Sequence, residues 1–209
     1  MPSAQSPAPP LEYLRLEIDR LWDGSPARPE ELVTLTLRAE EEALVVEVDA
    51  PFHGDPPPPG PPGPRDRLWE HEVVELFLAE AGAPRDRARY TELELGPHGH
   101  YLLLRLEGAR RPVESGIALP YHSQVGPSLA TGIEPPAAPG VLPGPEVPHG
   151  RWRGVARLHR ALLPGPPHRG NAYAIHGQGA LRRHLAWAPV PGPAPDFHRL
   201  ELFRDLILP

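Results

Sequence analysis

Clustered prolines constrain the fold of this chain more than any other feature of its sequence. Proline makes up 33 of the 209 residues, about three times its ordinary share. The prolines gather in three segments, Pro51–Pro64, Pro135–Pro148 and Pro189–Pro195. Because proline lacks the backbone N–H that a paired strand requires, we expect these segments to be loops between elements. Their density also predicts stiff loops with polyproline II character.

Between these segments, apolar and polar residues alternate with the period of two that is typical of β-strands. The alternation is clearest in residues 33–38, 44–49, 92–95 and 101–106, and residues 197–203 close the chain in the same style. About nine to eleven such strands, separated by turn residues, predict an all-β fold. The expected architecture is a two-sheet antiparallel β-sandwich.

The length favours a single domain over residues 1–209, with residues 1–10 as a flexible tail. All-β folds often reach this size as one unit, and no internal repeat or change of composition marks a boundary. One helix-like stretch, Arg157–Leu163, is ended by Pro164 and is too short to change the fold class.

The composition excludes several kinds of chemistry. There is no cysteine, so disulfides, thiolate metal sites and a cysteine nucleophile are excluded. All 21 basic residues are arginine, which excludes Schiff-base lysine chemistry and a Walker-type phosphate lysine. The net charge is -6, and Asp86 interrupts the nearest approach to a basic stripe, at Arg85, Arg87 and Arg89. We therefore expect no nucleic-acid partner.

Neither a membrane span nor a secretory signal is visible in the sequence. No segment approaches the ~18 apolar residues that a spanning helix requires. Met1–Pro10 has neither a basic start nor an apolar run. We expect a cytoplasmic protein without a membrane partner.

The segment LWEHEVVELFL at Leu68–Leu78 resembles the signature strand of the family 9 carbohydrate-binding modules, in which a tryptophan precedes an acidic and apolar strand. Further matching strings follow in the same order: YTELELGPHG, RWRGVARLHRALLP and PDFHRLELF. A closer resemblance, which adds LWDG, APFHGDPPPPG and AIHG, is to a conserved, uncharacterised protein family with a fold of this type. It covers most of the chain and implies a sandwich similar to the family 9 modules, without an activity to carry over.

The family 9 modules hold a sugar ring between two tryptophans and fix it with charged and amide groups. By resemblance, Trp69 matches the first tryptophan and Glu75 the acid of the signature strand. Glu94 stands at the position of an expected arginine, and Pro191–Pro195 stands where the second tryptophan would fall. The expected ligand-binding residues are therefore Trp69, Glu75 and Glu94, in an incomplete form of the family's sugar clamp.

Glu75 is notable on physical grounds alone. It shares one strand face with Val73 and Phe77, while Val74 and Leu76 point to the other, so the strand is expected to be central and Glu75 partly buried. A buried carboxylate needs a partner. That partner is either a ligand or metal, or one of the many arginines.

The eleven histidines raise a second possibility. His98, His176 and His198 each lie in a string that carries the resemblance, at or near an expected strand end. Imidazoles with a carboxylate are ordinary zinc or iron ligands, so these three are candidate ligands of a divalent metal if they converge. The alternative is that each is a structural hydrogen-bonding residue.

Three functional hypotheses remain open at this point. The first is a non-catalytic module that binds a small, carbohydrate-like ligand beside Trp69 and Glu75. The second is a metal-binding protein or enzyme that uses a His/Glu cluster on the sandwich face. The third is a protein-interaction scaffold built on the proline-rich loops. No cofactor beyond the possible metal is expected.

Overall fold

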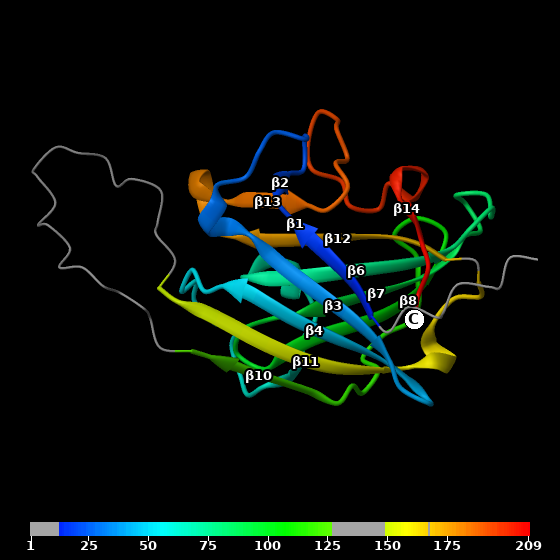
Figure 1. The fold of residues 1–209 in the computed structure, drawn as a ribbon, viewed down its shortest axis with the longest axis horizontal. Coiled ribbons are helices and arrows are strands. Elements are labelled where there is room, and N and C mark those ends of the chain that lie inside the picture. The colour runs from blue at the N-terminus through cyan, green and yellow to red at the C-terminus, as the bar shows by residue number, and fades with distance from the viewer. Residues whose placement is uncertain (1–12, 127–148, 167) are drawn as a thin grey trace, which may run out of the picture.

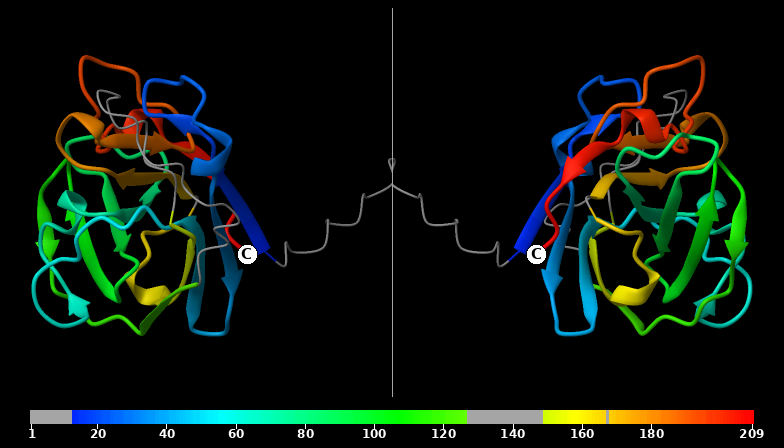
Figure 2. Two further views of the ribbon diagram at one scale, coloured as in Figure 1. Left: turned by 90° about the vertical axis from the view of Figure 1, so that its left-hand side faces the viewer. Right: turned by 90° about the vertical axis from the view of Figure 1, so that its right-hand side faces the viewer.

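The protein folds into two antiparallel β-sheets that lie face to face (Figures 1 and 2). This computed structural model describes residues 13–126, 149–166 and 168–209. The expected tail at residues 1–10 and the proline cluster at 135–148 lie outside this range. Fourteen strands are described, of which four are only two or three residues long. The all-β sandwich predicted from the alternation is confirmed.

The smaller sheet has five strands in the order β1-β3-β4-β11-β10. Its strands are β1 (Tyr13–Ile18), β3 (Val33–Ala39), β4 (Ala43–Pro51), β10 (Tyr121–Val125) and β11 (Arg151–His159).

The larger sheet has nine strands and runs β2-β13-β12-β6-β7-β8-β5, with β14 beside β12 and β9 beside β8. Its strands are β2 (Arg20–Leu21), β5 (Gly63–Pro64), β6 (Val73–Glu80), β7 (Arg89–Leu95), β8 (His100–Glu107), β9 (Pro112–Glu114), β12 (His168–His176), β13 (Arg183–Ala186) and β14 (Arg204–Leu206). All pairs are antiparallel except β5 with β8. The strand β6, which carries the LWEHEVVELFL string, lies in the middle of this sheet, as predicted.

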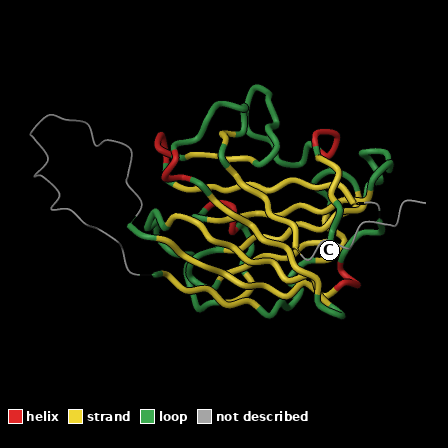
Figure 3. The backbone as a smooth tube through the Cα atoms, in the orientation of Figure 1, coloured by secondary structure: helices red, strands yellow, loops and turns green. Residues whose placement is uncertain are grey.

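Helical structure in the described residues is confined to five short 3-10 turns (Figure 3). They are η1 (Pro29–Glu31), η2 (Leu68–Glu70), η3 (Arg160–Leu162), η4 (Gly179–Leu181) and η5 (Leu200–Leu202). No helix in the described ranges has the length and hydropathy needed to cross a membrane.

Two local predictions were wrong. The stretch 157–163 is not a helix: residues up to His159 continue β11, and a single turn, η3, follows. The segment 197–203 is not a strand, because η5 occupies most of its second half. Phe197, Leu200 and Phe203 recur every third residue and all pack on the outer side of the larger sheet, which is the spacing of a 3-10 turn.

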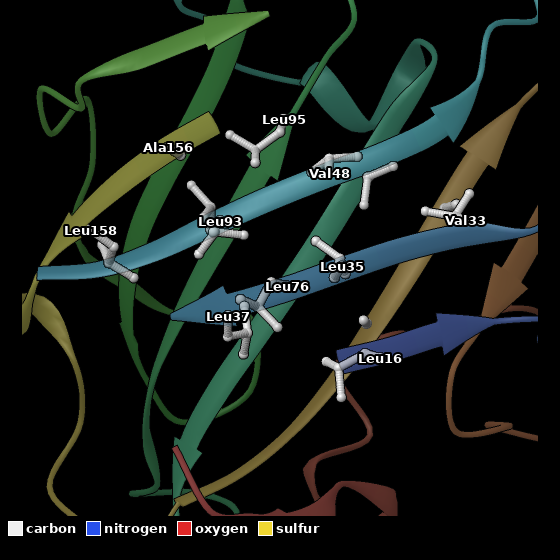
Figure 4. Close-up of a cluster of buried hydrophobic side chains, with 14 of the residues drawn as sticks. Leu16, Val33, Leu35, Leu37, Val48, Leu76, Leu93, Leu95, Ala156 and Leu158 are labelled. Atoms are coloured by element: carbon white, nitrogen blue, oxygen red, sulfur yellow. The ribbon is translucent and has the colours of Figure 1, made fainter. Parts of the chain in front are cut away.

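The main core lies between the two sheets. Leu35 and Leu37 of β3 and Val48 of β4 meet Leu76 of β6 and Leu93 of β7 there (Figure 4). Because successive side chains of a strand alternate between its faces, the other half of β6 and β7 points to the outer face of the larger sheet. A second apolar cluster, which includes Val73, Phe77 and Phe203, covers part of that outer face.

Removal of one inward side chain should test this layered core. Leu35 is fully buried between the sheets, whereas its neighbour Thr36 points outward and is only half-buried. Leu35→Ala is expected to lower the free energy of unfolding by about 2–5 kcal/mol through lost burial and a cavity. Thr36→Ala should change it by no more than about 0.5 kcal/mol. Urea denaturation measures both, and equal effects of the two substitutions would contradict the assigned faces.

Candidate functional site

A cavity of about 900 Å³ opens on the outer face of the larger sheet. Its floor is formed by side chains of four adjacent strands, among them Glu75 of β6, Glu92 of β7, Leu104 of β8 and Ile175 of β12. Its walls come from three segments between strands: residues 66–70, 110–115 and 195–198. The size is that of a site for a small molecule.

Three glutamates occupy the outer face of β6 and β7: Glu75 and Glu92 line this cavity, and Glu94 lies beside Glu75 beneath it. Glu75 pairs across the strands with Glu94, and Phe77 with Glu92. The alternation that sends Leu93 into the core sends Glu92 and Glu94 to the outer side. Their side chains are almost completely buried, with exposures of 3%, 4% and 0% for Glu75, Glu92 and Glu94.

These carboxylates have few partners within the described part of the chain. Oε2 of Glu92 and both carboxylate oxygens of Glu94 are buried without a well-formed hydrogen bond there. Their nearest donors are a proton that the two carboxyl groups can share and the backbone N–H of Trp69. Burial without compensating donors disfavours the charged form of a carboxylate. Burial raises the pKa of Glu92 to about 7. Burial and the neighbouring carboxylates, Glu92 for Glu75 and both others for Glu94, hold the pKa values of Glu75 and Glu94 well above the usual range.

Trp69 stands at the rim of the cavity on the turn η2, with 39% of its surface exposed. The guanidinium of Arg182 holds this turn, because it donates hydrogen bonds to the carbonyl oxygens of Trp69, Glu70 and Gly177. Leu68, the residue before Trp69, is fully buried. The backbone of Trp69 is therefore held in place, while its indole ring is partly exposed at the edge of the cavity.

The opposite wall is formed by two segments that an ion pair joins. Arg110 donates to Oδ1 of Asp196 over 2.7 Å. The backbone N–H of Arg110 also donates to the hydroxyl of Tyr90 (2.9 Å), which lies 2.8 Å from Nδ1 of His198. The Tyr90 hydroxyl therefore links the backbone of Arg110 to the ring of His198.

Both histidines of the cavity lining are neutral at pH 7. Burial lowers the pKa of His198 to about 4, with Arg110 adding to the effect. Burial and Arg182 likewise lower the pKa of His184 to about 4. Neutral imidazoles supply a hydrogen-bond donor and an acceptor each, without a positive charge that could balance the glutamates.

Backbone strain lies at two places beside the cavity. Among the described residues, the non-glycine residues with positive φ are Arg67, at 59°, and Arg110, at 58°. Arg67 immediately precedes η2 and its Trp69, and Arg110 lines the opposite wall. Strained conformations of this kind cluster at ligand sites, where the surrounding structure holds them in place.

The structure separates the three histidines that the sequence proposed as metal ligands. His198 lies at the cavity, whereas His176 is stacked on His53, with ring centroids 3.5 Å apart, and lies 3.2 Å from Glu31. His98 packs its ring edge against Phe52, 5.6 Å away. Within the described ranges, no group of three or more His, Asp or Glu side chains is placed to hold a metal ion. The convergence that the metal hypothesis required is absent from this part of the chain.

The proposed ligand-binding residues do come together. Trp69 and Glu75 both line the cavity, and Glu94 lies directly beside Glu75 on the next strand. The sequence analysis missed Glu92, although the period of two that places Glu94 on the outer face places Glu92 there too. It also missed Arg110, Arg182 and His184, which reach the cavity only through the tertiary fold.

Fold and site together define an antiparallel β-sandwich with a ligand-sized cavity on the outer face of its larger sheet. The chain belongs to the UPF0462 family. It is 33% identical to the UPF0462 protein C4orf33 homolog of Danio rerio, over 91% of this chain and 87% of that protein. It is 35% identical to the homolog of Rattus norvegicus and 32% identical to the UPF0462 protein C4orf33 of Homo sapiens, in each case over 90% of this chain and 85% of the relative. No family model matches the chain.

A solved structure shares the fold. The crystal structure of "a putative carbohydrate-binding protein" from Bacteroides uniformis aligns with a TM-score of 0.62, over 91% of this chain and 84% of that one. The sequence identity is 16%. The likeness supports the sandwich that the resemblance to the family 9 modules implied.

The raised pKa of Glu92 predicts an unusual dependence of stability on pH. Its pKa is about 7 in the folded protein and near the ordinary 4.5 in the unfolded chain, so the unfolded chain loses this proton first as the pH rises. Glu92 thus lowers stability progressively between about pH 4.5 and 7. Glu92→Gln, which does not titrate, should be about as stable as the wild type at pH 4 and roughly 3 kcal/mol more stable above pH 7.

Glu80, on the same strand as Glu75, provides a control, because it should change the dependence of stability on pH in the opposite direction. Its hydrogen bonds from Arg89 lower its pKa, so Glu80 contributes stability that is present at neutral pH and lost in acid. Glu80→Gln should therefore lose stability relative to the wild type as the pH rises. Denaturant unfolding at a series of pH values measures both variants, and a Glu92→Gln curve parallel to the wild type would show that Glu92 has an ordinary pKa.

Proposed function

We propose that this protein is a non-catalytic binding module for a small, carbohydrate-like ligand, which it holds in the cavity beside Trp69. The observation that carries the proposal is the combination of an exposed indole at the rim with two buried carboxyl groups at the floor, Glu75 and Glu92. A sugar ring presents an apolar face of C–H groups that can pack on an indole. Its hydroxyl groups can donate hydrogen bonds to Glu75 and Glu92.

The other polar groups of the lining suit the same kind of ligand. The neutral imidazoles of His184 and His198 each offer a donor and an acceptor, as hydroxyl groups require. Arg182 is engaged with backbone carbonyls and Arg110 with Asp196, so these side chains position the walls. The described fold is also that of a protein described as a putative carbohydrate-binding protein, and that likeness supports the proposal.

The cavity differs from the two-tryptophan clamp of the family 9 modules. The wall opposite Trp69 is formed by Pro195 and Phe197, and the ring of Phe197 is stacked on Tyr173 with centroids 3.8 Å apart. A sugar ring could then stack on one aromatic side chain, Trp69, in place of two. Because a stacked aromatic contact contributes about 0.5–1.5 kcal/mol beyond its buried area, we expect weak binding.

An enzyme that uses the same cluster is the second candidate. It is favoured by the presence of protonatable Glu75 and Glu92 beside the neutral His198 in one cavity, since a carboxyl group with a pKa near 7 can serve as a general acid. Release of nitrophenol from nitrophenyl glycosides, lost in both Glu75→Gln and Glu92→Gln, would favour this candidate. No release above background would favour the binding module.

The binding proposal predicts that removal of Trp69 abolishes most of the affinity. A panel of mono- and disaccharides is screened by saturation-transfer NMR, and the sugars that bind are titrated by calorimetry. Trp69→Ala is expected to weaken binding at least about fivefold, because it removes the stacking surface. Trp187→Ala is the matched control, since Trp187 lies outside the cavity lining and packs beside Arg204.

Two results would contradict the proposal. One is that no sugar of the panel binds at millimolar concentration. The other is that binding survives Trp69→Ala and is lost in Trp187→Ala, which would place the ligand elsewhere on the molecule.

A further inference from the structure

The carboxylates of the cavity outnumber the positive charges that face them. Its lining contains Asp66, Glu70, Glu75 and Glu92 against two guanidinium groups. Both guanidinium groups are already engaged. Arg110 is paired with Asp196, and Arg182 donates to the carbonyl oxygens of Trp69, Glu70 and Gly177.

Glu92 points to a ligand independently of this excess of acidic residues. Its side chain is 4% exposed, it lines the cavity, and its Oε2 has no well-formed hydrogen bond in the described part of the chain. Glu94, two residues along on the same face of β7, lies outside the cavity lining, and its carboxyl group is near enough to that of Glu92 for the two to share a proton. A buried carboxylate in such surroundings is destabilised until a donor or a positive charge reaches it.

We propose that the ligand of this cavity carries a protonated amine, as an amino sugar does, and that the ammonium group binds to Glu92 and Glu75. The inference rests on the proposed function and narrows its ligand class. An ammonium group supplies three N–H donors and the missing positive charge, whereas a hydroxyl group supplies one donor and no charge. An ammonium group should therefore bind to Glu75 and Glu92 with a more favourable free energy than any neutral substituent of a sugar.

None of the other groups that the structure describes around the floor supplies an unpaired positive charge to Glu75 and Glu92, so that charge would have to come from the ligand. The titratable and charged groups that face it are Asp66 and Glu70 from the η2 segment, Glu75 from β6, Tyr90, Glu92 and Glu94 from β7, Tyr173 from β12, His184 from β13, and Arg110, Arg182, Asp196 and His198 from the walls. The two imidazoles are neutral near pH 7 and the two phenols keep their protons.

Binding of an amine should also release protons from the protein. The pKa of Glu92 is about 7, so near neutral pH this carboxyl group is protonated in about half of the apo molecules, and a cation placed beside a carboxyl group favours its charged form. The ligand therefore displaces a proton that Glu92 held. A neutral sugar leaves the protonation of the floor unchanged, so the two ligand classes give different proton counts.

The test compares three sugars that share one ring: glucosamine, glucose and N-acetylglucosamine. Each is titrated into the full chain by calorimetry near neutral pH, in two buffers of different ionisation enthalpy. Glucosamine is expected to bind at least about tenfold more tightly than the other two and to release protons, and they should release none. Glu92→Gln should remove both the preference and the proton release, so that glucosamine then binds no more tightly than glucose.

Glu70→Gln is the matched control. Glu70 lines the same cavity, but its carboxylate is exposed and paired with Arg67, so its loss should leave the preference for glucosamine in place. A preference that Glu70→Gln and Glu92→Gln reduce equally would reflect the general acidity of the cavity and would overturn the assignment to Glu92. Circular dichroism confirms that both variants are folded.

Ethanolamine, spermidine and magnesium, calcium and zinc chlorides complete the set of probes. Equal binding of glucose and glucosamine would overturn the amine inference and leave the proposed function standing. Binding of glucosamine and ethanolamine without any neutral sugar would support the amine site and overturn the carbohydrate-like ligand. A metal ion that binds through Glu92 in place of the amines, or no binding of any probe, would overturn the inference.

Discussion

The central constraint on this molecule is the burial of three glutamates in the middle of its larger sheet. Strands β6 and β7 are covered on both sides, by the smaller sheet on one and by the η2 and 187–203 segments on the other. Alternation puts Glu75, Glu92 and Glu94 on the outer of these two faces, where an all-apolar set would pack without electrostatic cost. The cavity, its walls and its proposed ligand all follow from the way in which this face is covered.

The covering segments leave a space over the glutamates, and their own contacts maintain it. Arg182 ties η2 to the end of β12 through backbone carbonyls, and Arg110 ties the segment after β8 to Asp196. The left-handed conformations of Arg67 and Arg110 lie in these two covering segments. A fold selected for stability alone would relax such strain and neutralise the buried carboxylates. The proposed binding function would explain why the strain and the buried carboxyl groups occur together around this cavity.

Much of this could be predicted from the sequence, because alternation with period two is a local signal. It identifies the central strand around Glu75 and the outward direction of Glu94, and applied to TELEL it would also have found Glu92. The resemblance to the family 9 modules adds Trp69. Residues 197–203 were misread since Phe197, Leu200 and Phe203 fit either a strand or a 3-10 turn in isolation, and tertiary packing decides between them. Arg110, Arg182 and His184 carry no local signal, and the histidines His98, His176 and His198 are distributed by topology that no spacing reveals.

The central claim is that Glu75 and Glu92 at the floor of the cavity, and Glu94 beside them, have strongly raised pKa values. Carbon-13 labelling of the glutamate side chains and an NMR titration of their carboxyl resonances would measure this directly, with Glu92→Gln and Glu94→Gln to assign the signals. The account predicts that Glu92 titrates near pH 7 and that the resonances of Glu75 and Glu94 titrate well above the ordinary range. Titration of all three near the ordinary value of 4.5 would mean that water or an arginine reaches them freely, and would contradict the account.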